Sequence, residues 1–186
     1  METALLLIDL QIDFLSEAGR MPVGSANAEK VIVTANHLIG YYNKRRWLII
    51  DVFSQFKKYD IIGNFFRKHA AAEGSEGGKM DPRILPHGAT CFPKSKSSAF
   101  SNPYLVEYLK EKEIDHIVLC GVYAEGCVRA TALAAQRAGL DVNLISDGTA
   151  SDRTSKYNWA LSHMQKRGVR ILSLEEYLKL NATRPT

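Results

Sequence analysis

Three reactive side chains, an acid, an amine and a thiol, stand at or just beyond the ends of apolar runs in this sequence. Asp9 ends the run ALLLID, Lys94 follows CFP, and Cys127 follows HIVLCGV after a short turn. The carboxyl ends of strands in an open parallel sheet share one edge, and sites form there. The pattern therefore predicts a cysteine nucleophile that an acid and a cation assist.

Cys127 opens an expected helix directly after a strand. Free N–H groups and the helix dipole lower the pKa of a thiol at a helix N-terminus, and the thiolate is the nucleophile. Gly121 and Gly126 favour a tight strand-to-helix elbow, whose N–H groups could stabilise a substrate oxyanion. We therefore expect an activated thiol with a lowered pKa. The alternative for Cys127 is a buried structural thiol.

Asp9 and Lys94 could supply the proton transfer and the charge that this nucleophile needs. A partly desolvated carboxylate could take the thiol proton and return it to a leaving amine. A cation beside both groups would keep the carboxylate ionised and lower the thiol pKa. The alternatives are a turn-forming cap for Asp9 and a solvated lysine for Lys94. Asp13 is interpreted as a local loop anchor.

The other cysteines and the histidines form no recognisable metal or disulfide pattern. The three cysteines are an odd set without CxxC or Cys/His zinc spacing. Cys120 lies inside an apolar run and is expected in the core, whereas the environment of Cys91 is ambiguous. The five histidines show no HxxxH spacing, and neither GxGxxG after a strand nor GxxxxGK[ST] supplies a phosphate cradle.

Apolar runs of four to eight residues alternate with longer stretches of helical period, which predicts an α/β fold with a parallel sheet between helices. With 186 residues, the chain fits one domain, 1–186. The expected strands are 4–8, 47–52, 90–92, 114–121, 141–146 and 169–172. The expected helices are 26–44, 102–112, 126–138, 153–167 and 174–180.

The stretch 53–88 is the least regular part of the chain. It contains the run EGSEGG and Asp81-Pro82, which predict a long exposed excursion. Long loops at strand ends commonly shape a substrate pocket. Phe14, Phe53 and Phe56 are candidates for the lining of that pocket.

Charge and hydropathy exclude several classes of partner. The net charge of +4 is mild, and the basic clusters 44–46 and 57–58 lack the interleaved aromatics of a nucleic-acid site, so no nucleic acid is expected. No apolar run approaches the roughly 20 residues of a membrane span. A strand that follows the first three residues leaves no room for a signal peptide, which favours the cytoplasm.

Four segments resemble those of the isochorismatase-like cysteine hydrolases, a family that includes nicotinamidases. They are LIDLQIDF at 7–14, PKSKSSAF at 93–100, GVYAEGCV at 121–128 and DGTAS at 147–151. They occur in the family's order along nearly the whole chain. The resemblance implies a three-layer αβα sandwich with a central, mainly parallel six-stranded sheet, and a homo-oligomer.

The same resemblance implies roles for individual residues. Asp9, Lys94 and Cys127 would form a catalytic triad. The peptide bond between Val122 and Tyr123 would be cis, and the backbone N–H groups of Tyr123 and Cys127 would form the oxyanion hole.

Two departures from the family pattern concern the substrate. Nicotinamidases hold a metal with an Asp-x-His after the second strand and a later histidine. Here the first pair is replaced by Asp51-Val52-Phe53, and His69 alone roughly matches the later ligand. One histidine does not make a divalent-metal site, so we expect no metal cofactor and disfavour nicotinamide. Secondly, Ala124 stands where a threonine is usual.

The sequence therefore predicts a cysteine amidohydrolase that cleaves the C–N bond of a small amide or carbamoyl compound through a thioester. Cys127 separates it from the true isochorismatases, which lack that nucleophile. Two alternatives stay open. One is a metal-dependent nicotinamidase, and the other is a catalytically idle member that binds a ligand or partner in the same pocket.

Overall fold

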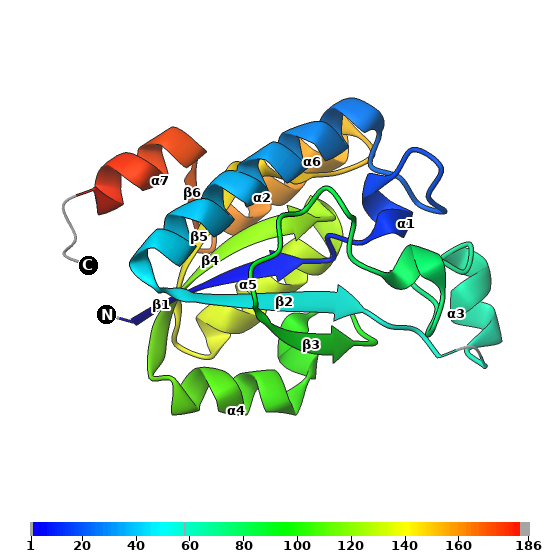
Figure 1. The fold of residues 1–186 in the computed structure, drawn as a ribbon, viewed down its shortest axis with the longest axis horizontal. Coiled ribbons are helices and arrows are strands. Elements are labelled where there is room, and N and C mark those ends of the chain that lie inside the picture. Colours follow the sequence, from blue (N-terminus) through cyan, green and yellow to red (C-terminus); the bar gives the residue numbers. More distant parts are fainter. Residues whose placement is uncertain (1, 58, 183–186) are drawn as a thin grey trace.

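The fold is seen in a computed structural model that describes residues 2–57 and 59–182. One sheet of parallel strands runs in the order β3-β2-β1-β4-β5-β6, with helices on both faces (Figure 1). The expected three-layer α/β architecture is confirmed. The strands are β1 (Glu2–Ile8), β2 (Leu48–Ser54), β3 (Thr90–Lys94), β4 (Ile114–Val122), β5 (Asp141–Ala150) and β6 (Arg170–Leu172).

Each predicted strand exists, and most extend further toward the site than the apolar runs indicate. β3 continues through Pro93 to Lys94, whose partner in the sheet is Ser54 of β2. β5 continues to Ala150, where Thr149 pairs with Gly121 of β4. Polar and small residues end the apolar pattern before the backbone pairing ends, so the predicted strands stop too early. Lys94 is therefore part of the sheet.

Two hydrophobic clusters separate the layers. Leu5 and Leu7 of β1 pack with α2 (Ser25–Arg45) and α7 (Leu174–Asn181) on one face. Leu6 and Ile8 face α4 (Pro103–Glu111), α5 (Arg129–Arg137) and α6 (Thr154–Gln165) on the other. This alternation follows from the two-residue period of a strand covered on both sides.

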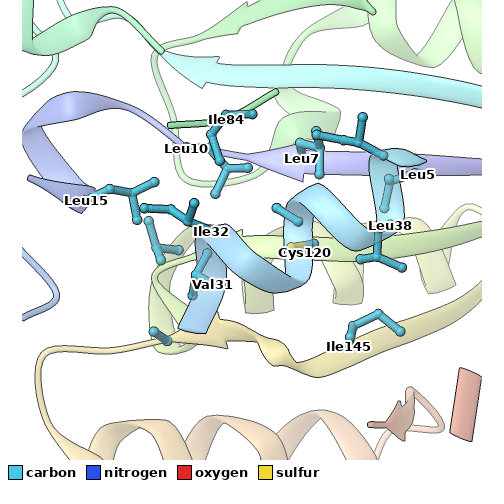
Figure 2. Packing of buried hydrophobic residues seen from close by; sticks show 14 of the residues in the cluster. Leu5, Leu7, Leu10, Leu15, Val31, Ile32, Leu38, Ile84, Cys120 and Ile145 are labelled. Atoms are coloured by element: carbon cyan, nitrogen blue, oxygen red, sulfur yellow. The ribbon is translucent and has the colours of Figure 1, made fainter. Parts of the chain in front are cut away.

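Cys120 belongs to the core, as predicted. It is fully buried and packs among Leu5, Leu7, Val31 and Leu38 of the α2 face (Figure 2). Burial raises the pKa of this thiol to about 12, which keeps it protonated.

The predicted helices are confirmed with shifted ends, and one differs in form. In the helix predicted over 126–138, a short turn η3 (Ala124–Val128) runs into α5, and the chain kinks at Gly126, whose backbone is non-helical with φ −102° and ψ −106°. Asn102 caps α4, because its side chain accepts a hydrogen bond from the N–H of Tyr104. Two short helices that the sequence did not indicate are α1 (Ile12–Leu15) and α3 (Ile61–Phe66).

The excursion 53–88 projects beyond the carboxyl ends of the strands and carries α3 and the 3-10 turn η1 (Glu76–Gly78) (Figure 1). Asp13 anchors it, as predicted, by accepting hydrogen bonds from the N–H groups of Arg20 and Ala71 at 3.2 and 2.8 Å. Gln11 exchanges two 2.9 Å bonds with the backbone of Ser54. These contacts hold the excursion over the ends of β1 and β2. None of the helices described is long and apolar enough to cross a membrane.

Candidate active site

Lys94 stands at the centre of a buried polar cluster at the carboxyl edge of the sheet. Its Nζ donates to Asp9 Oδ2 at 2.8 Å, to Ser54 Oγ at 2.8 Å and to Cys127 Sγ at 3.2 Å. The four side chains come from the ends of β1, β2 and β3 and from η3. The structure thus brings together the three predicted reactive residues and adds one, Ser54, that the sequence did not indicate.

Asp9 is held in an uncommon backbone conformation directly after β1. Its φ of 55° lies in the left-handed region, which Asp adopts more readily than most residues. Its N–H donates to Val52 O at 2.8 Å, which fixes it against β2. The carboxylate is buried, and its second oxygen, Oδ1, has no hydrogen-bond partner among the described residues. One oxygen therefore pairs with the amine while the other can accept a proton.

Lys94 is 3% exposed, so its charge depends on its neighbours. Burial favours the neutral amine, but the Asp9 carboxylate and the hydrogen bonds to Asp9 and Cys127 outweigh this effect and hold the pKa of Lys94 above its usual value. Its three contacts give each ammonium hydrogen an acceptor. The side chain is consequently a fixed cation between the acid and the thiol.

The elbow before Cys127 depends on a glycine. Gly121 has a φ of 142°, and a Cβ there would lie 2.0 Å from Ile8 O of the adjacent strand. The next peptide bond, Val122–Tyr123, is cis. The O of Tyr123 accepts from the N–H groups of Gly126 and Val128 at 3.0 and 3.2 Å. This turn brings the thiol over the end of β1, beside Asp9.

The pKa of the Cys127 thiol is raised, whereas the sequence predicted a lowered one. Burial raises its pKa to about 12, the Asp9 carboxylate raises it as well, and Lys94 opposes them. The chain kinks at Gly126, whose backbone is non-helical, and runs on through Val128 into α5, so Cys127 lies at the start of this helical stretch as expected. The thiol is therefore protonated at neutral pH, next to a carboxylate that can receive its proton.

A cavity of about 400 Å³ adjoins this cluster. Ser54 belongs to both, because it lines the cavity and accepts a hydrogen bond from Lys94. The excursion forms one wall, as predicted for a pocket-shaping loop. Lining residues from the strand ends and this wall include Leu7, Leu10, Gln11, Phe53, Ala71 and Met80.

Of the three predicted pocket aromatics, Phe53 alone lies among the described residues that line this cavity. Phe14 is instead buried against the edge of Tyr123, with ring centres 5.9 Å apart. Phe56 packs on the core beneath the guanidinium of Arg67, which lies 3.9 Å from the ring centre.

The residues present do not fit the metal that nicotinamidases hold. By the sequence resemblance Asp51 would stand at the position of the acid, but both its carboxylate oxygens lie close to His87 Nε2, at 3.0 and 3.1 Å. Phe53 stands in place of the histidine of the Asp-x-His pair. His69, the match for the later histidine, is exposed. In the described ranges, no group of three His, Cys, Asp or Glu side chains could hold a metal ion. The sequence did not indicate the part played by His87.

Comparison with known proteins gives consistent matches over the whole sheet. The Isochorismatase domain matches residues 3–176, a range that includes Asp9, Lys94 and Cys127. The nicotinamidase of Escherichia coli (strain K12) is 27% identical over 178 residues, covering 78% of this chain and 81% of that protein.

Two solved structures agree with the fold. An isochorismatase-like hydrolase from Alkaliphilus metalliredigens has a TM-score of 0.88 at 26% identity, over 97% of this chain and 99% of that one. The pyrazinamidase of Pyrococcus horikoshii, solved in complex with zinc, has a TM-score of 0.81 at 26% identity, over 93% and 99%.

Proposed function

This chain belongs to the isochorismatase family of hydrolases, and from that premise we propose that it is a cysteine amidohydrolase. Its substrate would be a small amide or carbamoyl compound. The observation that carries the proposal is the set of contacts from Lys94 Nζ to Asp9, Ser54 and Cys127. An acid, a fixed cation and a thiol in one buried cluster supply the groups that nucleophilic acyl transfer needs.

The first step moves one proton and forms one bond. As Cys127 Sγ attacks the carbonyl carbon, its proton passes to Asp9, whose Oδ1 has no other hydrogen-bond partner among the described residues. The raised pKa of the free thiol means that this transfer accompanies attack instead of preceding it. The carbonyl oxygen becomes an oxyanion, which the backbone N–H groups of Tyr123 and Cys127 would stabilise.

The second step breaks the C–N bond. Protonated Asp9 gives its proton to the leaving nitrogen, the amine departs, and the acyl group stays on Cys127 as a thioester. Asp9, again a carboxylate, then takes a proton from water as the water attacks the thioester carbonyl. The C–S bond breaks, the acid leaves, and the thiol recovers its proton.

Lys94 remains a cation throughout and transfers no proton. Its raised pKa supports this role, because the ammonium stabilises both the Asp9 carboxylate and negative charge on sulfur during attack. Ser54 holds the ammonium in place without touching the substrate carbonyl. A cytoplasmic location and a homo-oligomeric assembly stay predictions from the sequence.

Ammonia release from a panel of small amides, ureas and carbamoyl compounds, nicotinamide included, tests the proposal. We expect release from at least one compound, and a loss of about 10³-fold or more in kcat for Cys127→Ala. Lys94→Met should lose activity as well, whereas Lys96→Met, an exposed neighbour, serves as the matched control. Wild-type release by Cys127→Ala would contradict the cysteine mechanism. A folded protein inactive on every compound would favour the idle, ligand-binding alternative.

A further inference from the structure

Asp51, which lines the cavity next to the proposed triad, is paired with the buried side chain of His87. His87 Nε2 lies 3.0 and 3.1 Å from the two carboxylate oxygens of Asp51, and His87 Nδ1 lies 2.5 Å from Leu85 O. Both ring nitrogens thus face hydrogen-bond acceptors, so the histidine side chain is held between Asp51 and Leu85 O. The two side chains are only 2% and 8% exposed.

The environment of His87 favours its protonated form. The hydrogen bond to Asp51 raises the pKa of His87 against the opposing effect of burial. Cys91 adds a third contact, because its thiol lies 3.8 Å from Asp51 Oδ2. The carboxylate of Asp51 is thereby fully engaged by groups of this chain.

The position of the Asp51–His87 pair indicates its role. Asp51 stands where nicotinamidases place their metal-binding acid, and it lines the cavity together with Cys91 and Phe53. In this chain the group bonded to that acid is the side chain of His87. The position that holds a histidine in nicotinamidases is occupied by the apolar ring of Phe53. A substrate in the cavity would meet hydrocarbon from Leu7, Leu10, Phe53 and Met80.

We propose that the Asp51–His87 pair takes the place of the divalent metal, and that the cavity beside it accepts the acyl part of amides that contain no metal-binding atom. Aliphatic and phenyl acyl groups are the chemical class that matches this lining. The part of the inference that concerns turnover rests on the proposed function, whereas the part that concerns the metal does not.

Equilibrium dialysis of the untagged protein against zinc, followed by metal analysis, tests the first part without any substrate. We expect the wild type to retain well below one zinc per chain. His69→Gln is the matched histidine control and should behave as the wild type. Stoichiometric zinc in the wild type overturns the proposal.

Benzamide and nicotinamide test the second part, because they share a shape and differ at one ring nitrogen. We expect kcat/KM values within about threefold of each other, since Leu7, Leu10, Phe53 and Met80 would contact the ring through hydrocarbon. A preference of about tenfold or more for nicotinamide overturns the proposal. Calorimetric binding of both amides to Cys127→Ala separates this outcome from a failure of the proposed function. If neither amide is hydrolysed, equal binding still supports the pocket, and absent or nicotinamide-selective binding overturns it.

Discussion

Lys94 and Ser54 are paired in register at the ends of β3 and β2, and Lys94 Nζ donates to Ser54 Oγ at 2.8 Å. The pairing of Lys94 with Ser54 explains why β3 continues through Pro93 to Lys94. The pairing puts both side chains on the same face of the sheet, and the hydroxyl receives the ammonium hydrogen that neither Asp9 nor Cys127 takes. The cation is thereby fixed in the position where it meets the acid and the thiol.

Replacing Ser54 by alanine should impair catalysis without abolishing it. The substitution leaves a buried ammonium hydrogen without its acceptor, which typically costs about 1–3 kcal/mol. If part of that penalty falls on the transition state, kcat drops about tenfold while KM changes little. Steady-state kinetics on any amide that the wild type hydrolyses measures this split. Ser97→Ala, at an exposed position after β3, is the control, and an unchanged kcat in Ser54→Ala would refute the role given to Ser54.

Alkylation of Cys127 by iodoacetamide should respond in opposite directions to removal of its two charged neighbours. Burial and the Asp9 carboxylate raise the thiol pKa, whereas Lys94 lowers it. Asp9→Asn should therefore lower the pKa and speed alkylation at about pH 8, and Lys94→Gln should slow it.

The alkylation rates are best compared in a Cys91→Ser background, because Cys91 is the exposed thiol and Cys120 is fully buried. In the parent protein the rate should keep rising with pH well above the usual thiol range, since the pKa is about 12. A plateau below about pH 8 would show a thiolate already formed and would contradict the protonated resting state.

Gly121→Ala should destabilise the protein strongly, because a Cβ there would lie 2.0 Å from Ile8 O and the backbone φ is 142°. We expect the free energy of unfolding to fall by at least about 2–3 kcal/mol. Gly40→Ala is the matched control, since Gly40 lies in α2 with nothing within 4 Å of its added Cβ, and alanine should stabilise that helix by about 0.5–1 kcal/mol. Urea titrations of both variants measure the difference. Equal effects at the two positions would contradict the close packing at the elbow.

The contribution of His87 to stability should depend on pH. Its hydrogen bond to Asp51 raises its pKa, so its stabilising effect is complete below the unfolded value of about 6.5 and is lost as pH rises through the folded value. The gap in unfolding free energy between wild type and His87→Gln should thus be larger at about pH 5.5 than at about pH 9. Urea titrations at both pH values measure it. A gap that does not change with pH would argue against an imidazolium on Asp51.

The strands of the sheet and three of the four residues in the polar cluster around Lys94 could be predicted from the sequence. Continuous apolar runs marked every strand, and Asp9, Lys94 and Cys127 stood out because each reactive group follows such a run. Their side chains meet for a simple reason, since parallel strands end at a common edge. The cavity wall was also anticipated, because the segment rich in Gly and polar residues leaves the sheet at that edge.

Other features depend on contacts that spacing does not encode. Nothing in the sequence around Ser54 marks it as a site residue. Its role follows from the register of β2 against β3, which pairs it with Lys94. His87 lies 36 positions after Asp51, in an irregular loop without a local motif. The thiol pKa was misjudged because burial and the nearness of Asp9, both set by tertiary packing, outweigh the effect of the helix start.

Intact-protein mass spectrometry of acid-quenched turnover tests the thioester on Cys127 most directly. With an amide that releases ammonia, we predict a mass increase equal to the acyl group, located by digestion on the peptide that carries Cys127 and absent from Cys127→Ala. Turnover that persists in Cys127→Ala, or an acyl group found on another residue of the wild type, would contradict the account.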